Sequence, residues 1–222
     1  MNIMIQSKFG NNILAQAKSN LTLLSFVVIL SSTFIGAVLF LFFNNGILVE
    51  NMTRDPNAIS GLPAYTGFIS QTGIFFWSAA SAICFFSYLL NKKQSINSGM
   101  NRFFIVSGMF TLLLGMDDAF LFHEAMLPAL GIPEKMVCIS YLLFTIAYLV
   151  TFRKKILKTD YIFLLMAFFF FGISMVFDNF SIPVRGIMLF EDGSKLVGII
   201  CWLAYFHRVG ISNVTNITNL KY

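Results

Sequence analysis

The residues from Leu21 to Phe43 form one apolar run that contains no charged side chain. A helix needs about 20 residues to cross the hydrocarbon core of a membrane, so this run is long enough to span it. Five further apolar runs follow it: Phe68 to Leu90, Phe103 to Phe122, Met136 to Phe152, Tyr161 to Phe177, and Leu196 to about Ile211. The pattern predicts an all-α fold, a polytopic membrane helix bundle of about six transmembrane helices.

The composition excludes a soluble domain. Hydrophobic residues make up 57% of the 222 residues, charged residues only 11%, and the mean hydropathy is +0.78. A soluble domain has roughly a quarter of its residues charged. The net charge of +5 does not indicate nucleic-acid binding, because no basic stripe with interleaved aromatic residues lies outside the apolar runs. We therefore expect a multi-pass membrane protein, whose partners are the lipid bilayer and either a second copy or another membrane protein.

The distribution of basic residues predicts the orientation. Cytoplasmic loops of membrane proteins are enriched in Lys and Arg. Eleven basic residues fall on the side of both termini: Lys8, Lys18, Lys92, Lys93, Arg102, Arg153, Lys154, Lys155, Lys158, Arg208 and Lys221. The other side has four, which are Arg54, Lys135, Arg185 and Lys195. Both termini are thus predicted to be cytoplasmic, with residues 1–20 as an N-terminal segment, 21–211 as the six-helix transmembrane domain and 212–222 as a tail.

The acidic residues show the opposite distribution. Only Asp160 falls on the predicted cytoplasmic side, whereas the other nine fall in or beyond the outer half of the membrane: Glu50, Asp55, Asp117, Asp118, Glu124, Glu134, Asp178, Glu191 and Asp192. Acidic residues contribute little to topology, so the positive-inside rule does not explain this pattern. It indicates that the acids have a role of their own near the outer surface.

The segment "MDDAFLFHE" brings three of these acids and one histidine to the outer end of the third predicted helix. In a continuous α-helix, Asp117 and Glu124 are seven residues apart and share a face, with His123 beside them and Asp118 turned about 100° away. Asp117 lies about 21 Å along the helix from Phe103, at a depth where a carboxylate costs roughly 2.5–3.5 kcal/mol and where we expect no helix end for it to cap. Asp117 with Glu124 is the predicted pair.

Two other predicted helices bring acids to the same level. The fifth ends with Asp178, and the sixth is preceded by "EDGSK", which contains Glu191, Asp192 and Lys195. Carboxylates with one imidazole suit a hard or borderline divalent cation. The leading hypothesis is therefore a divalent-metal site of Asp117, Glu124, His123 and Asp178, supported by Asp118, Glu191, Asp192 and Lys195, in a metal-dependent hydrolase.

Two alternatives assign the same acids differently. In a proton- or cation-coupled transporter Asp117 would titrate during transport, because like charges held close raise the pKa of a carboxyl group. In a non-catalytic scaffold or assembly factor the acids would form a structural polar network. Helix stability alone could also account for the polar residues at the start of the sixth helix. Asp192 or Ser194 could cap that helix, and Lys195 could pair with Glu191.

The phrases "MDDAFLFHE", "GIPEKMV" and "EDGSKLVGIICWLAYF" resemble an uncharacterised group of small bacterial multi-pass membrane proteins, over residues 100–208. That resemblance implies a location in a bacterial plasma membrane and no particular activity. A fainter likeness is to the ceramidase-like membrane hydrolases, seven-helix proteins with a zinc site of three histidines, an Asp and a Ser. This sequence departs from that site, because it has one histidine, His123, on the predicted outer side and no HxxxH.

Overall fold

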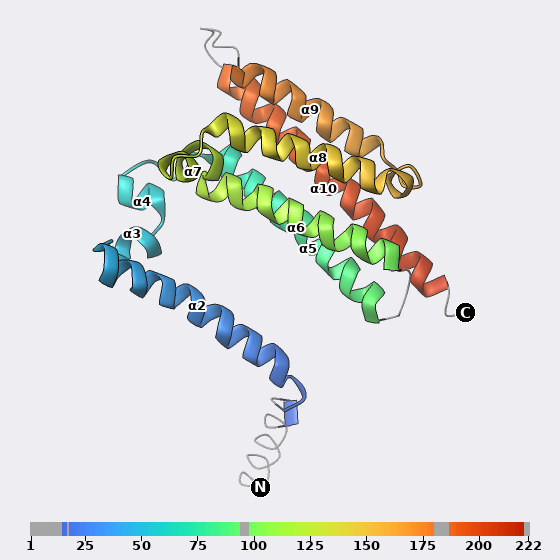
Figure 1. Ribbon diagram of the computed structural model, residues 1–222, viewed down its shortest axis with the longest axis horizontal. Helices are drawn as coiled ribbons and strands as arrows, with labels where there is room; N and C mark the ends of the chain where they lie inside the picture. The colour runs from blue at the N-terminus through green and yellow to red at the C-terminus, as the bar shows by residue number, and fades with distance from the viewer. Residues whose placement is uncertain (1–14, 17, 94–97, 180–186, 220–222) are drawn as a thin grey trace. The chain divides into compact units, whose positions relative to one another are not determined.

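The computed structural model describes residues 15–16, 18–93, 98–179 and 187–219, and within these ranges every regular element is a helix (Figure 1). The chain divides into two compact units, Met1–Thr66 and Gly67–Tyr222. The first unit contains α2 (Leu21–Asn45), α3 (Val49–Thr53) and α4 (Pro56–Ser60). The second contains α5 (Phe68–Lys93), α6 (Ser98–Phe120), the π-helix η1 (Phe122–Met126), α7 (Leu127–Ala129), α8 (Glu134–Ile156), α9 (Ile162–Asn179) and α10 (Ile187–Asn219).

Five helices are long and apolar enough to cross a membrane: α2, α5, α6, α8 and α10. The predicted all-α, multi-pass character of the chain is therefore confirmed. The fifth predicted span corresponds to α9, whose apolar part, Ile162–Phe177, is shorter than the other five. Exposed large apolar side chains occur along all these helices, which suits contact with lipid.

The long helix of the first unit, α2, consists mainly of apolar residues. Its end is well defined by Gly46, which takes the left-handed conformation (φ 66°) that a helix-terminating glycine adopts without steric cost. The backbone N–H of Gly46 donates to the carbonyl of Phe42 at 3.1 Å. The apolar composition of α2 suits a helix surrounded by lipid.

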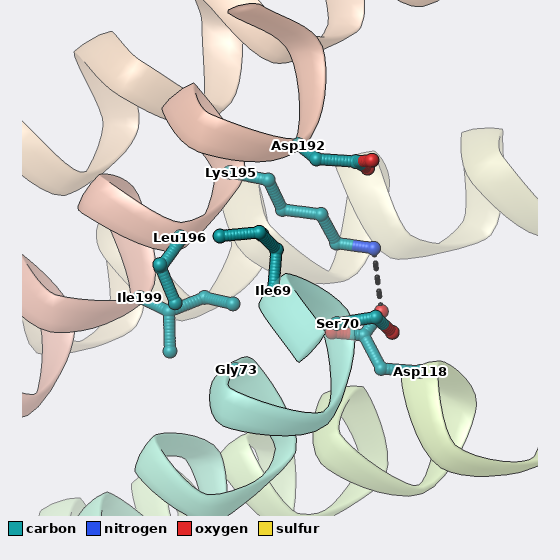
Figure 2. Close-up of a pocket in the computed structure, with 8 residues that line it drawn as sticks. All are labelled: Ile69, Ser70, Gly73, Asp118, Asp192, Lys195, Leu196 and Ile199. Atoms are coloured by element: carbon teal, nitrogen blue, oxygen red, sulfur yellow. Dashed lines mark ion pairs between the residues drawn. The ribbon is translucent and has the colours of Figure 1, made fainter. Parts of the chain in front are cut away.

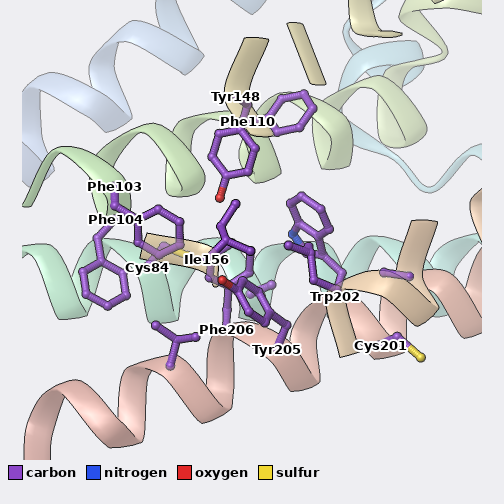
Figure 3. Packing of buried hydrophobic residues seen from close by; sticks show 14 of the residues in the cluster. Cys84, Phe103, Phe104, Phe110, Tyr148, Ile156, Cys201, Trp202, Tyr205 and Phe206 are labelled. Carbon is purple, nitrogen blue, oxygen red and sulfur yellow. The ribbon is translucent and has the colours of Figure 1, made fainter. Parts of the chain in front are cut away.

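The core of the second unit is largely aromatic, and Trp202 of α10 is at its centre (Figure 3). The Trp202 ring makes edge-to-face contacts with Trp77 and Phe206, at centroid distances of 5.9 and 5.3 Å. Its Nε1 donates to Thr111 Oγ1 at 3.0 Å, so the polar atom of the buried indole is satisfied. This core joins α5, α6, α8, α9 and α10 into one bundle.

Glycines on α6 allow α5 to approach closely. A Cβ atom on Gly115 would lie 2.9 Å from the Cβ of Trp77, and one on Gly108 would lie 3.0 Å from the ring of Phe85. Small residues allow such approaches between membrane helices. In the facing segment of α5, Ala80 and Ser81 are buried, whereas Ser78 and Ala82 are exposed.

The last helix begins earlier than predicted. The structure starts α10 at Ile187, whereas the apolar run suggested Leu196. Asp192 and Ser194 consequently lie within the helix, and the prediction that one of them caps its N-terminus is wrong. The reason is that polar residues on the exposed side of a helix do not interrupt it when the opposite side packs against a neighbour.

We predict that Gly115→Ala lowers the free energy of unfolding by about 1–3 kcal/mol, because the new methyl group must displace Trp77 at its Cβ rather than at a flexible end. SDS unfolding of the purified full chain in mixed micelles would measure this. Gly172→Ala in α9 is the matched control, since nothing lies within 4 Å of its added Cβ, and it should be neutral or slightly stabilising. Equal effects of the two substitutions would contradict the packing explanation.

Candidate functional site

The backbone leaves the α-helical path directly after α6. Leu121 takes a left-handed conformation (φ 52°, ψ 46°), and a five-residue π-helix, η1, follows it. For a residue with a Cβ this conformation costs roughly 1–2 kcal/mol. The prediction that Asp117 and Glu124 share the face of one continuous helix is therefore wrong, because the helix ends between them.

The carboxylate of Asp117 is hydrogen-bonded to a residue beyond this break and to a residue of another helix. Its Oδ1 accepts the backbone N–H of His123 at 3.0 Å and the hydroxyl of Tyr141 in α8 at 2.9 Å. Its Oδ2 is hydrogen-bonded to Nδ1 of the His123 ring. Asp117 is only 4% exposed, so these protein donors replace its hydration. Contrary to the sequence-based expectation, Asp117 does cap a helix end, namely the first turn of η1.

The imidazole of His123 connects this buried carboxylate to the surface of the bundle. With Nδ1–H donating to Asp117, the second ring nitrogen, Nε2, lies 3.5 Å from the Glu124 carboxylate. The hydrogen bond with Asp117 raises the pKa of His123 above its usual 6.5, against the opposing effect of partial burial, and Glu124 contributes to the rise. The Glu124 side chain is 54% exposed, so it faces the surroundings rather than Asp117.

The neighbouring acid, Asp118, forms a separate cluster on another side of α6. Its Oδ2 accepts the indole N–H of Trp77 in α5 at 2.8 Å. Its Oδ1 lies 2.7 Å from Nζ of Lys195 in α10, as Figure 2 shows. Lys195 therefore forms its ion pair with another helix, and not the predicted i,i+4 pair with Glu191. Asp117 and Asp118 together link α6 to η1, α8, α5 and α10.

A small cavity adjoins the Asp118–Lys195 pair (Figure 2). It has a volume of about 30 Å³, and Ser70, Gly73 and Asp192 contribute to its lining. That volume suffices for one or two water molecules, which need roughly 10–15 Å³ each. It is too small for an organic substrate, so it can hydrate the ion pair but not bind a metabolite.

The remaining predicted ligands do not join these clusters into a metal site. Asp192 is exposed and Glu191 partly exposed, while the side chain of Asp178 lies outside the described part of the chain. Among the described residues, no group of three or more His, Cys, Asp or Glu side chains is arranged to hold a metal ion. The donors that come together, Asp117 with His123, are already hydrogen-bonded to each other. Metal binding therefore stays a prediction.

Two aromatic residues of the site, Trp77 and Tyr141, were not predicted. Both carry one polar atom on an otherwise apolar ring, and such atoms usually find a partner when the ring is buried. A Trp or Tyr within an apolar run is therefore a signal that a polar partner exists. Local spacing does not identify that partner, because Asp117 and Tyr141 are separated by 24 residues and a helix connection.

We predict that Asp118 and Lys195 stabilise the fold as a coupled pair. A double-mutant cycle with Asp118→Asn and Lys195→Met should give a coupling energy of about 1–3 kcal/mol, because the Asp118 side chain is only 9% exposed and Lys195 reaches it from another helix. The matched control is the exposed Asp160–Arg208 pair, for which a cycle with Asp160→Asn and Arg208→Gln should give about 0.2–1 kcal/mol. SDS unfolding in mixed micelles measures both cycles. Equal coupling in the two would show that Asp118–Lys195 is only a surface pair.

Comparison with known proteins places the chain in a family. Its residues 21–209 match the family described as "Domain of unknown function (DUF8692)". No curated protein and no solved structure matches the chain. The matched range includes α2, both aspartates, His123 and Lys195, so the candidate site lies wholly within it. Because the match covers most of its length, the chain belongs to the DUF8692 family.

Proposed function

We propose that this chain is a proton-coupled membrane protein, in which the Asp117–His123 pair exchanges a proton with the extracytoplasmic side. The observation that carries the proposal is the position of His123. One ring nitrogen is hydrogen-bonded to the buried carboxylate of Asp117, and the other faces the exposed carboxylate of Glu124. An imidazole between a buried and an exposed carboxylate is suited to passing a proton between them.

The proposal includes a topology. Six membrane spans, with α9 as the shortest, and cytoplasmic termini in a bacterial plasma membrane bring the end of α6 and the start of α10 to the outer surface. The distribution of Lys and Arg supports this orientation. In it, Glu124 and His123 face the extracytoplasmic solution, and Asp117 lies within the bundle.

The proton transfer balances without a cofactor. In the resting state the proton is bound to His123 Nδ1, and this N–H group donates a hydrogen bond to the Asp117 carboxylate. A proton taken up at Nε2 gives an imidazolium between two carboxylates. Passing the Nδ1 proton to Asp117 then leaves a neutral histidine and a neutral carboxyl group. The net result is one proton moved from the surface to a buried residue, where the interactions with Tyr141 and His123 that depend on the Asp117 charge are weakened.

A non-catalytic scaffold is the second candidate, and one observation favours it. Both carboxylate oxygens of Asp118 are satisfied, by Trp77 and Lys195, and the adjoining cavity is only of water size. A network whose polar groups are all paired can stabilise helix packing without exchanging protons with the surroundings. The candidates differ in whether protonation of His123 changes the state of the protein.

We predict that His123 titrates above pH 6.5 in the folded protein and that Asp117→Asn returns its pKa toward the usual value. NMR of histidine-labelled protein in micelles would measure this. The chain contains only two histidines, so exposed His207 provides an internal reference signal, and His207→Gln assigns it. A His123 pKa that does not respond to Asp117→Asn would contradict the pairing.

The same pair predicts a dependence of stability on pH. A histidine whose folded pKa is raised stabilises the fold fully below its unfolded pKa of about 6.5, and the contribution is lost as the pH rises through the folded pKa. The Tm of the wild type should fall more than that of His123→Gln between pH 6.5 and pH 9. Parallel pH profiles would contradict a stabilising role for the protonated ring.

Proteoliposomes and metal analysis then test the function. An inward pH gradient should dissipate faster with wild-type protein than with His123→Gln, as measured by a dye inside the liposomes. Flux equal to that of His123→Gln, together with lower stability of the variant, would favour the scaffold. Elemental analysis of the wild type and Asp117→Asn tests the metal hypothesis separately, since a stoichiometric metal lost in the variant would support that hypothesis instead.

A further inference from the structure

One end of the second unit is strongly basic. At the end where α5 and α8 finish and α6 begins (Figure 1), the described residues include seven cations: Lys92, Lys93, Arg102, Arg153, Lys154, Lys155 and Lys158. Asp160, which follows α8, is the single acid in this part of the described chain, and it is bound to Arg208 at 2.5 Å. The basic end therefore has a large excess of positive charge without carboxylate partners.

Two of these cations, Arg102 of α6 and Lys155 of α8, belong to the contact between the start of α6 and the end of α8. Lys155 Nζ donates to the backbone carbonyl of Gly99 in the first turn of α6 at 2.5 Å and lies 5.2 Å from the centroid of the Phe152 ring. Arg102 is close enough to exert an electrostatic effect on Lys155. Neither forms an ion pair with a carboxylate within the described ranges, so their charges are not neutralised by an acidic side chain there.

The surface next to Arg102 changes from charged to apolar along α6. Met109 and Met116 follow Arg102 at intervals of seven residues, which places all three on one face of the helix. Both methionines are exposed, at 62% and 40%. A cationic position followed by an exposed apolar stripe matches an amphiphile with an anionic head and a hydrocarbon chain.

We propose that Arg102 and Lys155 bind the phosphate headgroup of an anionic membrane lipid, whose acyl chain lies along the Met109–Met116 stripe of α6. A guanidinium binds two phosphate oxygens at once, and the ammonium adds a second charge-assisted contact. The phosphate separates the two cations and relieves their repulsion. The apolar stripe favours a lipid over a soluble phosphate, because only the lipid covers both parts. This site is independent of the proposed proton exchange at His123, which lies at the opposite end of α6.

Native mass spectrometry of the full chain from micelles containing equal amounts of phosphatidylglycerol and phosphatidylcholine tests the proposal. The wild type should retain phosphatidylglycerol preferentially. Arg102→Gln should weaken its binding about fivefold, and Arg102→Gln with Lys155→Gln about thirtyfold, since a surface cation contributes roughly 1 kcal/mol toward an anionic lipid. Arg54→Gln with Lys135→Gln removes the same charge at other positions and is the matched control, which should bind as the wild type does.

The exposed position of Arg102 makes its single variant informative if the double variant unfolds, because Arg102→Gln leaves the Lys155–Gly99 contact intact. Unchanged phosphatidylglycerol binding in Arg102→Gln, or an equal loss in the control, would overturn the proposal. Glycerol 3-phosphate provides the last arm. If it competes with the lipid at similar concentrations, the site recognises a soluble phosphate, and the lipid assignment fails.

Discussion

The adjacent carboxylates of Asp117 and Asp118 are the interaction on which the second unit depends. Consecutive residues of a helix point about 100° apart, so the two side chains reach different neighbours. Asp117 accepts hydrogen bonds from His123 and Tyr141, and Asp118 from Trp77 and Lys195. An unpartnered carboxylate among apolar helices would be strongly unfavourable, and therefore α5, α8, α10 and η1 must all supply donors at the end of α6. The glycine at position 115 permits this arrangement, because it lets α5 bring the Trp77 indole within reach of Asp118.

The two carboxylates have different partners, and this difference separates structure from chemistry. Both oxygens of Asp118 are occupied, by Trp77 and Lys195, and a cavity for one or two water molecules lies beside the pair. The Asp117 cluster continues through the imidazole of His123 to exposed Glu124. The left-handed backbone at Leu121 makes this connection, since it turns the chain so that His123 folds back onto Asp117. Backbone strain of this kind and π-helical turns are common at functional sites.

The charge distribution along the bundle connects the two proposals. The described cations collect where α5 and α8 finish, and the acids collect where α6 finishes and α10 begins. A helix bundle with opposite charges at its ends interacts with two different environments. The basic end suits an anionic lipid surface, and the acidic end offers groups that exchange protons with water. Between them, the aromatic core around Trp202 leaves few polar groups, and these are largely paired within the bundle, as Thr111 is with Trp202 and Ser107 with Tyr148.

The sequence by itself determined the helical, membrane-spanning class and the importance of Asp117, because hydrophobic length and the cost of a buried carboxylate are local properties. Span limits were less predictable: α10 begins nine residues before its apolar run, since packing against α9 and α5 sustains a helix that hydrophobicity alone does not mark. Only the tertiary structure decided the partners. His123, rather than Glu124, lies beside Asp117 because the α-helix ends at Leu121. Lys195 pairs with Asp118, rather than with Glu191, because α10 brings its ammonium group within ion-pair distance of that carboxylate. Such pairings depend on how helices that are distant in the sequence approach one another, and residue spacing within a single helix gives no information on that.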